Sequence, residues 1–223
     1  METNDKKPKE SQEKRTIYFI TGNKSKFEEA QLIMQQELGE TDIEFGFADI
    51  KLEEPKTLDQ ERIVRAKAEQ AFKALGKPVI CDDTAIVFEA YNNFPGTFTK
   101  YVFETIGFEG VAKLLAGKSR NAHFQTLLCY KDDSHCLVFR GTWRGVITED
   151  ISKMFNPDWQ YNSIFIPEGF LVPLSELTME ERAKHSHRKK ALQKLAEWLS
   201  YSNEKSNAVQ EAQQAVALAI GGN

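Results

Sequence analysis

The sequence predicts an α/β protein built on a mixed β-sheet with flanking helices. Strand-like and helical patterns alternate through the first half of the chain, and consecutive strand-like runs follow in the second half. Alternation is typical of parallel strands joined by helices, whereas consecutive strands usually pair antiparallel. With 223 residues, of which 41% are hydrophobic, the chain is long enough to bury the core of one domain, or of two lobes that share it.

The elements of the first half are indicated by the spacing of their apolar residues, which alternate in strands and follow the helical turn in helices. The run at 17–20 is wholly apolar and predicts a buried strand. In chain order we expect a strand at 17–20, a helix at 26–38, a strand at 43–49, a helix at 58–75, and extended segments at 78–81 and 85–90 on either side of an acidic pair.

In the second half, Gly107 and Gly110 interrupt an otherwise helical pattern. The loop NPDWQYNS is polar and irregular, apart from its two aromatic residues. We expect a helix at 98–116 with a break near the glycines, extended runs at 122–130, 135–140 and 142–148, a short strand in IFIP, and a last helix at 178–199.

Both ends of the chain differ in composition from the middle. Residues 1–15 are polar and lack the apolar residues that a core requires. At the other end a polar linker begins at Ser202, and an Ala/Gln-rich stretch follows that is typical of a weak helix before Gly221 and Gly222. We therefore predict a disordered N-terminal tail at 1–15, one domain at 16–200 and a flexible C-terminal tail at 201–223.

The bulk composition excludes several classes of protein. The formal net charge of -4 disfavours nucleic acid as a partner, because sequence-independent binding needs a basic face. No apolar run approaches the roughly 18 residues of a membrane span, and the charged start lacks a secretion signal. Three cysteines without a CxxC spacing indicate neither a disulfide framework nor a zinc site. We expect a cytoplasmic protein with no membrane partner.

The stretch IYFITGNKSK places a glycine, an amide and two lysines where a strand gives way to a helix. The first backbone N–H groups of a helix lack intrahelical partners, and the helix dipole favours negative charge there. Thr21 and Asn23 can donate or cap, and Lys24 and Lys26 add positive charge. Phosphate binding and an ordinary capped helix with surface lysines are about equally compatible with this spacing.

Asp82 and Asp83 end an apolar strand, and ligands of α/β proteins gather at such strand ends. Two carboxylates plus substrate phosphates would suit Mg²⁺. Adjacent strand residues point to opposite faces, so both carboxylates reach one ion only if the strand breaks there. Taken alone, the pair slightly favours a solvated acidic turn over a metal site.

Several basic and aromatic residues occupy unusual positions. Lys67 and Arg188 lie on the apolar stripes of their helices, where each either extends to the edge or meets a buried anion. Lys100 is in the first turn of a helix, against the helix dipole. Trp159 and Tyr161 could stack on a base or cover the edge of the core.

The order of the motifs is more specific than any one of them. Beginning at TGNKSK, the chain continues with LEEP, RAKAEQAF, CDDTAI, FPGTFTKYV, RNAHFQTLLCY, FRGTWRGVI, IFIPEGF and HSHRKKALQKL. Together they resemble the inosine triphosphate pyrophosphatase family over about residues 16–199. The T-G-N-x-x-K opening and Ser186-His187-Arg188 are the most specific parts. The resemblance implies an elongated fold with two lobes around a central nucleotide-binding cleft, usually as a homodimer.

The resemblance also implies an activity, the Mg²⁺-dependent hydrolysis of ITP, XTP or deoxy forms such as dITP to the monophosphate and pyrophosphate. By motif, Asp83 would activate water. Glu54, Asp82 and Asp83 would hold the metal, and the roles of the carboxylates could be exchanged. The substrate-binding positions would be Thr21, Gly22, Asn23, Lys26, Lys67, Thr84, Lys100, Trp159, Tyr161, Asn162, Arg182, His187 and Arg188.

This chain departs from the family pattern at the base end. Family members read Phe-Gly-Trp/Tyr-Asp-Pro where it has WQYNS at 159–163, and Arg182 stands in place of a lysine. Tyr161 retains an aromatic shelf, Gln160 replaces a glycine, and Asn162 replaces an acid. Because an amide can flip to donate or accept, we expect pyrophosphohydrolysis with relaxed or shifted base selectivity. The alternative is a nucleotide-binding or interaction domain that has lost turnover.

Overall fold

The structure, a computed structural model, describes residues 15–39, 41–149 and 157–220, with the backbone alone for 157–159 and 206–220. Seven strands form one mixed sheet in the order β2-β1-β3-β5-β6-β7, and β4 pairs with the end of β3. The β1–β2 and β1–β3 pairs are parallel and the others antiparallel. The strands are β1 (Arg15–Ile20), β2 (Ile43–Ala48), β3 (Val79–Phe88), β4 (Phe94–Pro95), β5 (Asn121–Lys131), β6 (Cys136–Ile147) and β7 (Phe165–Pro167).

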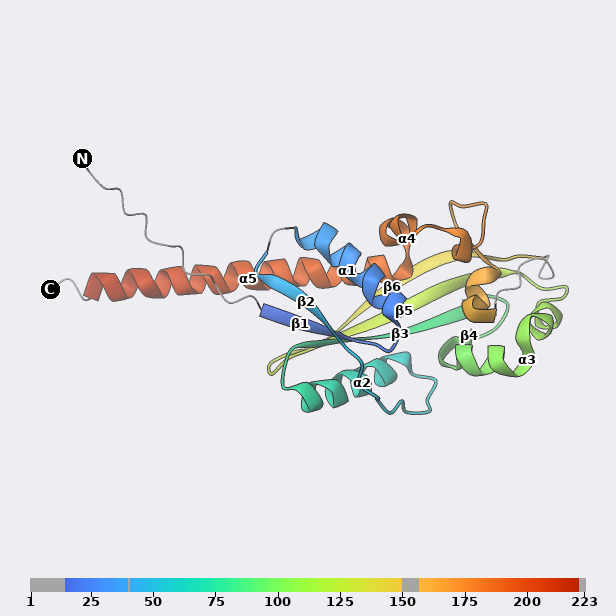
Figure 1. Ribbon diagram of the computed structural model, residues 1–223, viewed down its shortest axis with the longest axis horizontal. Coiled ribbons are helices and arrows are strands. Elements are labelled where there is room, and N and C mark those ends of the chain that lie inside the picture. The colour runs from blue at the N-terminus through green and yellow to red at the C-terminus, as the bar shows by residue number, and fades with distance from the viewer. Residues whose placement is uncertain (1–14, 40, 150–156, 221–223) are drawn as a thin grey trace.

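Helices cover both faces of this sheet (Figure 1). α1, α4 and α5 lie on one face, α2 lies on the other, and α3 packs at the far end of the molecule. The helices are α1 (Lys24–Leu38), α2 (Gln60–Leu75), α3 (Thr99–Leu114), α4 (Met179–His185) and α5 (His187–Ile220), with short 3₁₀ turns η1 (Gly96–Phe98), η2 (Pro157–Ser163) and η3 (Leu174–Glu176). The expected mixed α/β architecture is confirmed.

The sheet is elongated (Figure 1). Three buried clusters lie along it and define two lobes. In the first lobe, apolar residues of α1 and α5 pack on one face of β1, β3 and β5, and those of α2 pack on the other face. In the second lobe an aromatic cluster joins the far ends of β3, β5 and β6 to α3 and η2. Tyr161 belongs to this cluster, with its ring centroid 5.1 Å from that of Phe103 and 5.9 Å from that of Phe88.

Side-chain caps determine where the helices begin. The Asn23 carboxamide oxygen accepts from the Lys26 N–H at 3.1 Å and starts α1. Asp59 caps α2 through the N–H groups of Glu61 and Arg62. Gly107 has a φ of 57° and interrupts α3, which confirms the break expected near the glycines.

Four features differ from the sequence-based expectations. β3 runs unbroken through the acidic pair, and the two runs expected at 135–140 and 142–148 are one strand, β6. The last helix is divided at Ser186, whose ψ of 160° ends α4. α5 then continues to Ile220, through the linker expected from Ser202. Of the predicted N-terminal tail, all but Arg15 lies outside the described residues. Over the described ranges, no helix has the length and apolarity required to cross a membrane.

Candidate active site

A cavity of about 240 Å³ lies where α1, α4 and α5 meet the sheet at the junction of the lobes. It brings together seven residues that the sequence predicts to bind substrate: Asn23, Lys26, Thr84, Asn162, Arg182, His187 and Arg188. It is also lined by five residues that the sequence reasoning missed: Ser25, Glu29, Phe124, Leu174 and Ser186. The cavity is therefore the candidate site.

Two helix N-termini converge on the cavity. α1 begins there at its Asn23 cap, and α5 begins there because Ser186 accepts from the Lys189 N–H at 3.1 Å through its hydroxyl. Each start presents unpaired backbone N–H groups and the positive end of a helix dipole. Lys26 and Arg188 add full positive charges beside them. Such an arrangement favours a bound anion.

Asp82 lies between the cations on this face of β3. The Lys26 ammonium is 3.3 Å from both carboxylate oxygens, and the Arg188 guanidinium is 3.3 Å from one of them. Asp82 is buried, which by itself would raise its pKa, but the charges of Lys26, Arg188 and Lys67 outweigh burial and hold the pKa well below its usual value. Asp82 is therefore an anion that holds two cations in place.

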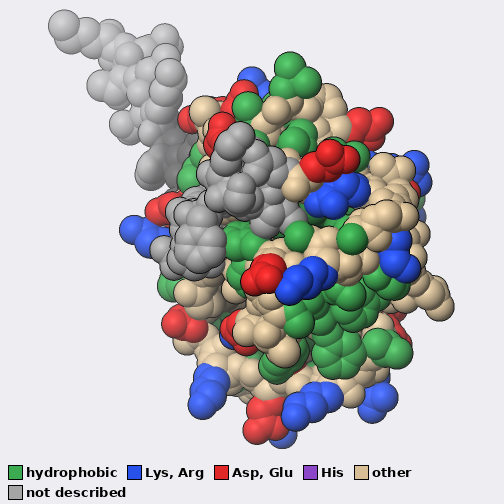
Figure 2. Space-filling model, turned by 90° about the vertical axis from the view of Figure 1, so that its right-hand side faces the viewer, with side chains coloured by type: hydrophobic (Ala, Val, Ile, Leu, Met, Phe, Trp, Pro, Cys, Tyr) green, Lys and Arg blue, Asp and Glu red, His purple; other side chains and the backbone are tan. Residues whose placement is uncertain are grey.

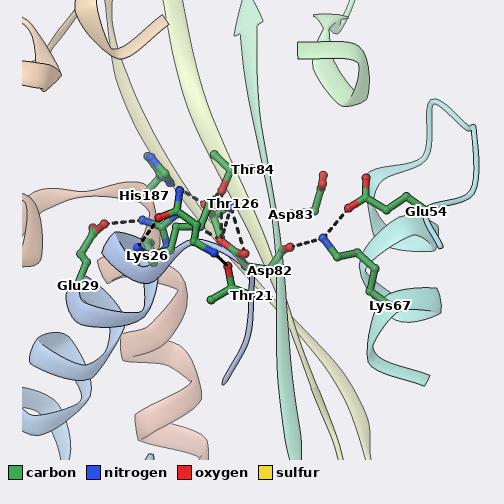
Figure 3. Close-up of polar contacts among 12 residues, drawn as sticks. Thr21, Lys26, Glu29, Glu54, Lys67, Asp82, Asp83, Thr84, Thr126 and His187 are labelled. Carbon is green, nitrogen blue, oxygen red and sulfur yellow. Dashed lines mark hydrogen bonds and ion pairs between the residues drawn. The ribbon is translucent and has the colours of Figure 1, made fainter. Parts of the chain in front are cut away.

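Glu29 is the most informative residue that sequence reasoning missed. It is buried on α1, where its carboxylate accepts from the Ser186 hydroxyl at 2.8 Å and from the Arg188 guanidinium at 2.5 Å (Figure 3). The signal was present, because Glu29 stands four residues before Ile33 on the buried face of α1. A carboxylate on such a face requires a partner.

Asp83 lies on the opposite face of β3, because the strand is unbroken and successive side chains alternate (Figure 3). On that face Lys67 donates to the Glu54 carboxylate at 2.8 Å and to the Asp82 backbone carbonyl at 2.9 Å. Gln60 donates to the Asp83 carbonyl at 3.1 Å. Asp83 itself has a buried carboxylate oxygen without a hydrogen-bond partner among the described residues, and burial raises its pKa.

The two faces of the sheet are connected at a stretch of β3 whose one edge has no neighbouring strand among the described strands. β1 pairs with β3 only as far as Cys81, and β4 pairs with it only from Val87. Between these points, among the described strands, β3 has β5 as its single neighbour. The cations of one face and the carboxylates of the other therefore meet at an uncovered strand edge, beside the α1 N-terminus.

A chain of hydrogen bonds runs from Asp82 to His187 beneath the cavity (Figure 3). Thr84 is 3.5 Å from the Asp82 carboxylate, Thr126 is 2.8 Å from Thr84, and His187 Nδ1 is 2.6 Å from the Thr126 hydroxyl. The His187 ring stacks on Phe124 with centroids 5.2 Å apart. Burial, followed by the charge of Arg188, lowers the pKa of His187 well below its usual value.

Gly141 allows α5 to start directly on the sheet. A Cβ atom at this position of β6 would lie 1.9 Å from the His187 carbonyl oxygen and 2.6 Å from the Ala191 nitrogen. Both are backbone atoms, so no side-chain movement would relieve the clash. A glycine is therefore required at this position of FRGTWRG, because it lets the backbone of α5 approach β6 closely enough to place His187 against Thr126.

Only some of the residues expected to contact the nucleotide base line the cavity. Asn162 and Arg182 line the cavity, but the Tyr161 ring is buried in the aromatic core and does not form the expected shelf. Phe124 is the aromatic residue that lines the cavity among the described residues. The Trp159 side chain lies outside the described residues. Gln160 has a φ of 40°, in the left-handed region that favours the glycine it replaces.

Three other predicted residues do not line the cavity. Thr21 precedes the α1 cap, where its hydroxyl accepts from the Asn23 N–H at 3.1 Å, and Gly22 is exposed beside it. Lys100 is exposed on α3, 3.7 Å from Glu104. Thr21 and Gly22 flank the start of α1, whereas Lys100 belongs to the second lobe.

The carboxylates fit a metal ion that is bound partly by substrate phosphates better than a metal site formed by the protein alone. No three acidic, His or Cys side chains of the described ranges gather as a metal site. A Mg²⁺ ion that is bound partly by substrate phosphates needs only one or two carboxylates. Asp83, with its unpartnered oxygen, and the half-exposed Glu54 fit that requirement. Asp82 does not join them, because Lys26 and Arg188 hold it on the other face.

Comparison with known proteins identifies the family of the chain. A family model described as the Ham1 family matches residues 17–198. A dITP/XTP pyrophosphatase of Methanopyrus kandleri is 39% identical over 184 residues, which are 82% of this chain and 95% of that protein. An inosine triphosphate pyrophosphatase of Yarrowia lipolytica is 35% identical over 195 residues, 86% of this chain and 99% of that protein.

Solved structures show the same fold. The Ham1 protein of Staphylococcus aureus superposes with a TM-score of 0.68 at 23% identity, over 84% of this chain and 100% of that one. A HAM1 protein from Coxiella burnetii gives a TM-score of 0.67 at 24% identity, over 84% of this chain and 99% of that one. At these identities the structural likeness concerns the fold alone.

Proposed function

The chain belongs to the Ham1 family, and on that premise we propose that it hydrolyses non-standard purine nucleoside triphosphates such as ITP, dITP and XTP to the monophosphate and pyrophosphate. One observation supports this assignment beyond the similarity. Cations and two helix N-termini line one face of β3, and an unpartnered carboxylate lies on the other face at the same open edge. A triphosphate needs cations around its oxygens and a carboxylate near the attacked phosphorus.

The phosphates would bind beside the α1 N-terminus. Lys26 and Arg188 line the cavity and are held in place by Asp82, so little side-chain entropy is lost when they receive an anion. Thr21 and Gly22 would let the backbone approach the phosphates. Lys67, Lys100 and Trp159 remain proposed substrate contacts, and Lys100 requires the second lobe to move toward the first.

A divalent cation, Mg²⁺ by the family resemblance, would be held by Asp83 and Glu54 together with the phosphates. It would neutralise the negative charge on the phosphate oxygens during attack. Asp82 was proposed as a third ligand from the sequence, and its place among Lys26 and Arg188 argues for a positioning role instead.

Asp83 would also accept the proton of the attacking water. Its buried oxygen is free of competing donors, and a raised pKa makes a carboxylate a stronger base. Lys67, fixed by Glu54 and by the Asp82 carbonyl, would stabilise the charge that develops on the leaving pyrophosphate. A domain that only binds nucleotides would not require this free carboxylate, which favours an enzyme over the alternative without turnover.

The base would lie near Phe124, Asn162, Arg182 and His187. Phe124 lines the cavity, and its ring stacks on that of His187, so the two rings would form one wall of the base site. The Asn162 amide and the Arg182 guanidinium replace the acid and the lysine of the family pattern, so we propose a relaxed or shifted base selectivity. We also propose a homodimer, which sedimentation equilibrium of the full chain would test.

The proposed activity is tested by pyrophosphate release from ITP, XTP, dITP, dUTP, GTP and ATP, with Mg²⁺ and with excess chelator. We expect release from the three non-standard purine nucleotides, loss of release with the chelator, and measurable turnover of at least one standard nucleotide. Strict selectivity for ITP and XTP would contradict the relaxed base selectivity. No pyrophosphate from any of the six would contradict the activity.

A further inference from the structure

The three cysteines lie on neighbouring strands, on the face of the sheet that α2 covers. Cys81 of β3 opposes Cys129 of β5, and Cys136 stands two residues before Val138, the residue of β6 that opposes Cys129. Cys81 and Cys129 belong to the buried cluster formed with α2, and Cys136 packs against it. The proposed hydrolysis uses none of the three, and none is among the described residues that line the candidate cavity.

The sulfur atoms of Cys129 and Cys136 are in contact, 3.7 Å apart. A disulfide bond is about 2.05 Å long, so the two atoms would have to approach by roughly 1.7 Å. Diagonal neighbours of an antiparallel pair are at the outer limit of disulfide geometry, so some backbone movement must accompany this approach. Cys136 is the first residue of β6 and follows the turn at 132–135, so a shift there disturbs the end of the ladder and not its middle.

Cys136 is half-buried and lines an open cavity of about 860 Å³ beside α2. Arg65 of α2 donates through Nη1 to the Cys136 carbonyl at 2.7 Å, and the same nitrogen is 3.4 Å from the Cys136 sulfur. The Glu61 carboxylate is bound to the other two nitrogens of this guanidinium, so Nη1 is left to Cys136. A thiolate on Cys136 would therefore be reachable from solvent and would lie beside a positive charge, the two conditions that make a cysteine reactive.

The cysteine pair lies far from the second lobe. The turn between β5 and β6 is at the end of the sheet away from α3 (Figure 1), whereas the surface of the second lobe faces the viewer in Figure 2. Cys81, by contrast, is fully buried on β3. Among the three, Cys136 is thus the thiol that a small oxidant can reach, and Cys129 is the thiol whose sulfur it contacts.

We propose that Cys136 is a site of oxidation by peroxides and that Cys129 converts the oxidised form to an intramolecular disulfide. This modification is independent of the proposed hydrolysis. In the first step the Cys136 thiolate attacks one oxygen of hydrogen peroxide, the O–O bond breaks, and a sulfenic acid and hydroxide are formed. In the second step the Cys129 sulfur attacks the Cys136 sulfur and the S–O bond breaks. The Cys129 proton leaves with the hydroxyl group as water. One peroxide thus gains the two electrons that the two thiols lose.

The environment of Cys129 is consistent with this order of steps. Burial, followed by the charge of Cys136, raises the pKa of the Cys129 thiol, so Cys129 stays protonated while Cys136 reacts. The sulfenic acid of Cys136 is neutral, so the first step removes the opposing charge. The contact between the sulfur atoms then makes the second step intramolecular, which favours the disulfide over further oxidation of Cys136.

Peptide mapping of the full chain tests the proposal. The reduced protein is freed of reductant and treated with hydrogen peroxide, and the remaining thiols are alkylated in denaturant. Trypsin cleaves after Arg120, Lys131 and Arg140, so Cys129 and Cys136 fall in separate peptides. We expect mass spectrometry to show these two peptides joined by a disulfide that dithiothreitol reverses. Unlinked peptides after peroxide treatment would overturn the proposal.

Substitutions test the order of the steps. Cys136→Ser should leave Cys129 unoxidised under the same treatment, and Cys129→Ala should leave Cys136 as a sulfenic acid that dimedone traps. Cys81→Ala is the matched control and should form the disulfide as fast as the wild type. A disulfide between Cys81 and Cys129 in the wild-type protein, or oxidation of Cys129 in Cys136→Ser, would overturn the proposal.

The part of Arg65 is measured as a rate. Arg65→Gln removes the charge beside the Cys136 sulfur and should slow the loss of thiols about tenfold, whereas Arg62→Gln removes a charge that lines the same cavity and should change the rate less than twofold. Equal rates in the two variants would overturn the activation of Cys136 by Arg65. Because no measurement here involves a nucleotide, failure of the proposed hydrolysis would show separately, as absence of pyrophosphate release.

Discussion

Asp82 and Asp83 are consecutive residues whose carboxylates lie on opposite faces of β3 (Figure 3). One is bound by Lys26 and Arg188 and has a lowered pKa. The other has a buried oxygen without a partner and a raised pKa. The pair is therefore not one acidic cluster. We assign the organisation of the cations to Asp82 and the chemistry to Asp83.

Asparagine at each position should separate these roles. Asp83→Asn should lower kcat by about 10²- to 10⁴-fold, the usual contribution of a general base, and leave the melting temperature unchanged or higher because a buried unpaired charge is removed. Asp82→Asn should cost about 3 kcal/mol of stability because two cations lose their shared anion. Turnover assays with thermal denaturation check both. A near wild-type rate in Asp83→Asn would remove Asp83 from the base role.

Glu29 should be required for the geometry of the cavity. In Glu29→Gln, Arg188 loses a buried charge partner, so we expect about 3 kcal/mol less stability and a KM for ITP raised more than kcat is lowered. The matched control is Glu28→Gln, which removes a charge from the preceding residue, where the ion pair with Lys24 is exposed. This control should cost less than about 0.5 kcal/mol of stability. Equal effects of the two substitutions, measured by urea denaturation and kinetics, would contradict the positioning role.

The neutral His187 should make stability depend on pH. Because the pKa of His187 is lowered in the folded protein, the unfolded chain binds a proton below about pH 6.5 that the folded protein does not. The free energy of unfolding should therefore fall as the pH falls below 6.5, by about 1.4 kcal/mol per pH unit from this residue. Denaturation of wild type and His187→Gln from pH 7 to pH 5 measures it as the difference in slope. Parallel curves would show that His187 titrates normally.

The backbone of Gln160 should be strained. Its φ of 40° lies in the left-handed region, where a side chain costs on the order of 1 kcal/mol or more. Gln160→Gly should therefore raise stability by about 1 kcal/mol, whereas Gln160→Ala keeps a Cβ atom and should bring no gain. Thermal denaturation of the two variants tests this, and a loss of stability in Gln160→Gly would show that the backbone is not strained there.

The start of α1 was predictable because its pattern is local. The T-G-N-x-x-K turn carries its own cap at Asn23 and its own cation at Lys26, and both line the cavity. The alternation of elements likewise predicted the mixed sheet. These features depend on residues within one or two turns of each other, which the spacing in the sequence records directly.

The rest depends on packing between distant segments. HSHRKK contains no glycine or proline, so the sequence gives no sign that Ser186 ends one helix and caps the next. Tyr161 could face the cavity or the core, and the contacts with Phe88 and Phe103 decide for the core. The extension of α5 to Ile220 was obscured by polar residues typical of a linker.

We propose that the cavity and the open edge of β3 together convert a nucleoside triphosphate to a monophosphate and pyrophosphate. Identification of the products of ITP by ³¹P NMR, with Mg²⁺ and with Asp83→Asn as the matched control, tests it most directly. We expect IMP and pyrophosphate in equal amounts from the wild-type protein, and release of both slowed by about a hundredfold or more in the variant. IDP with inorganic phosphate, or intact ITP, would contradict it.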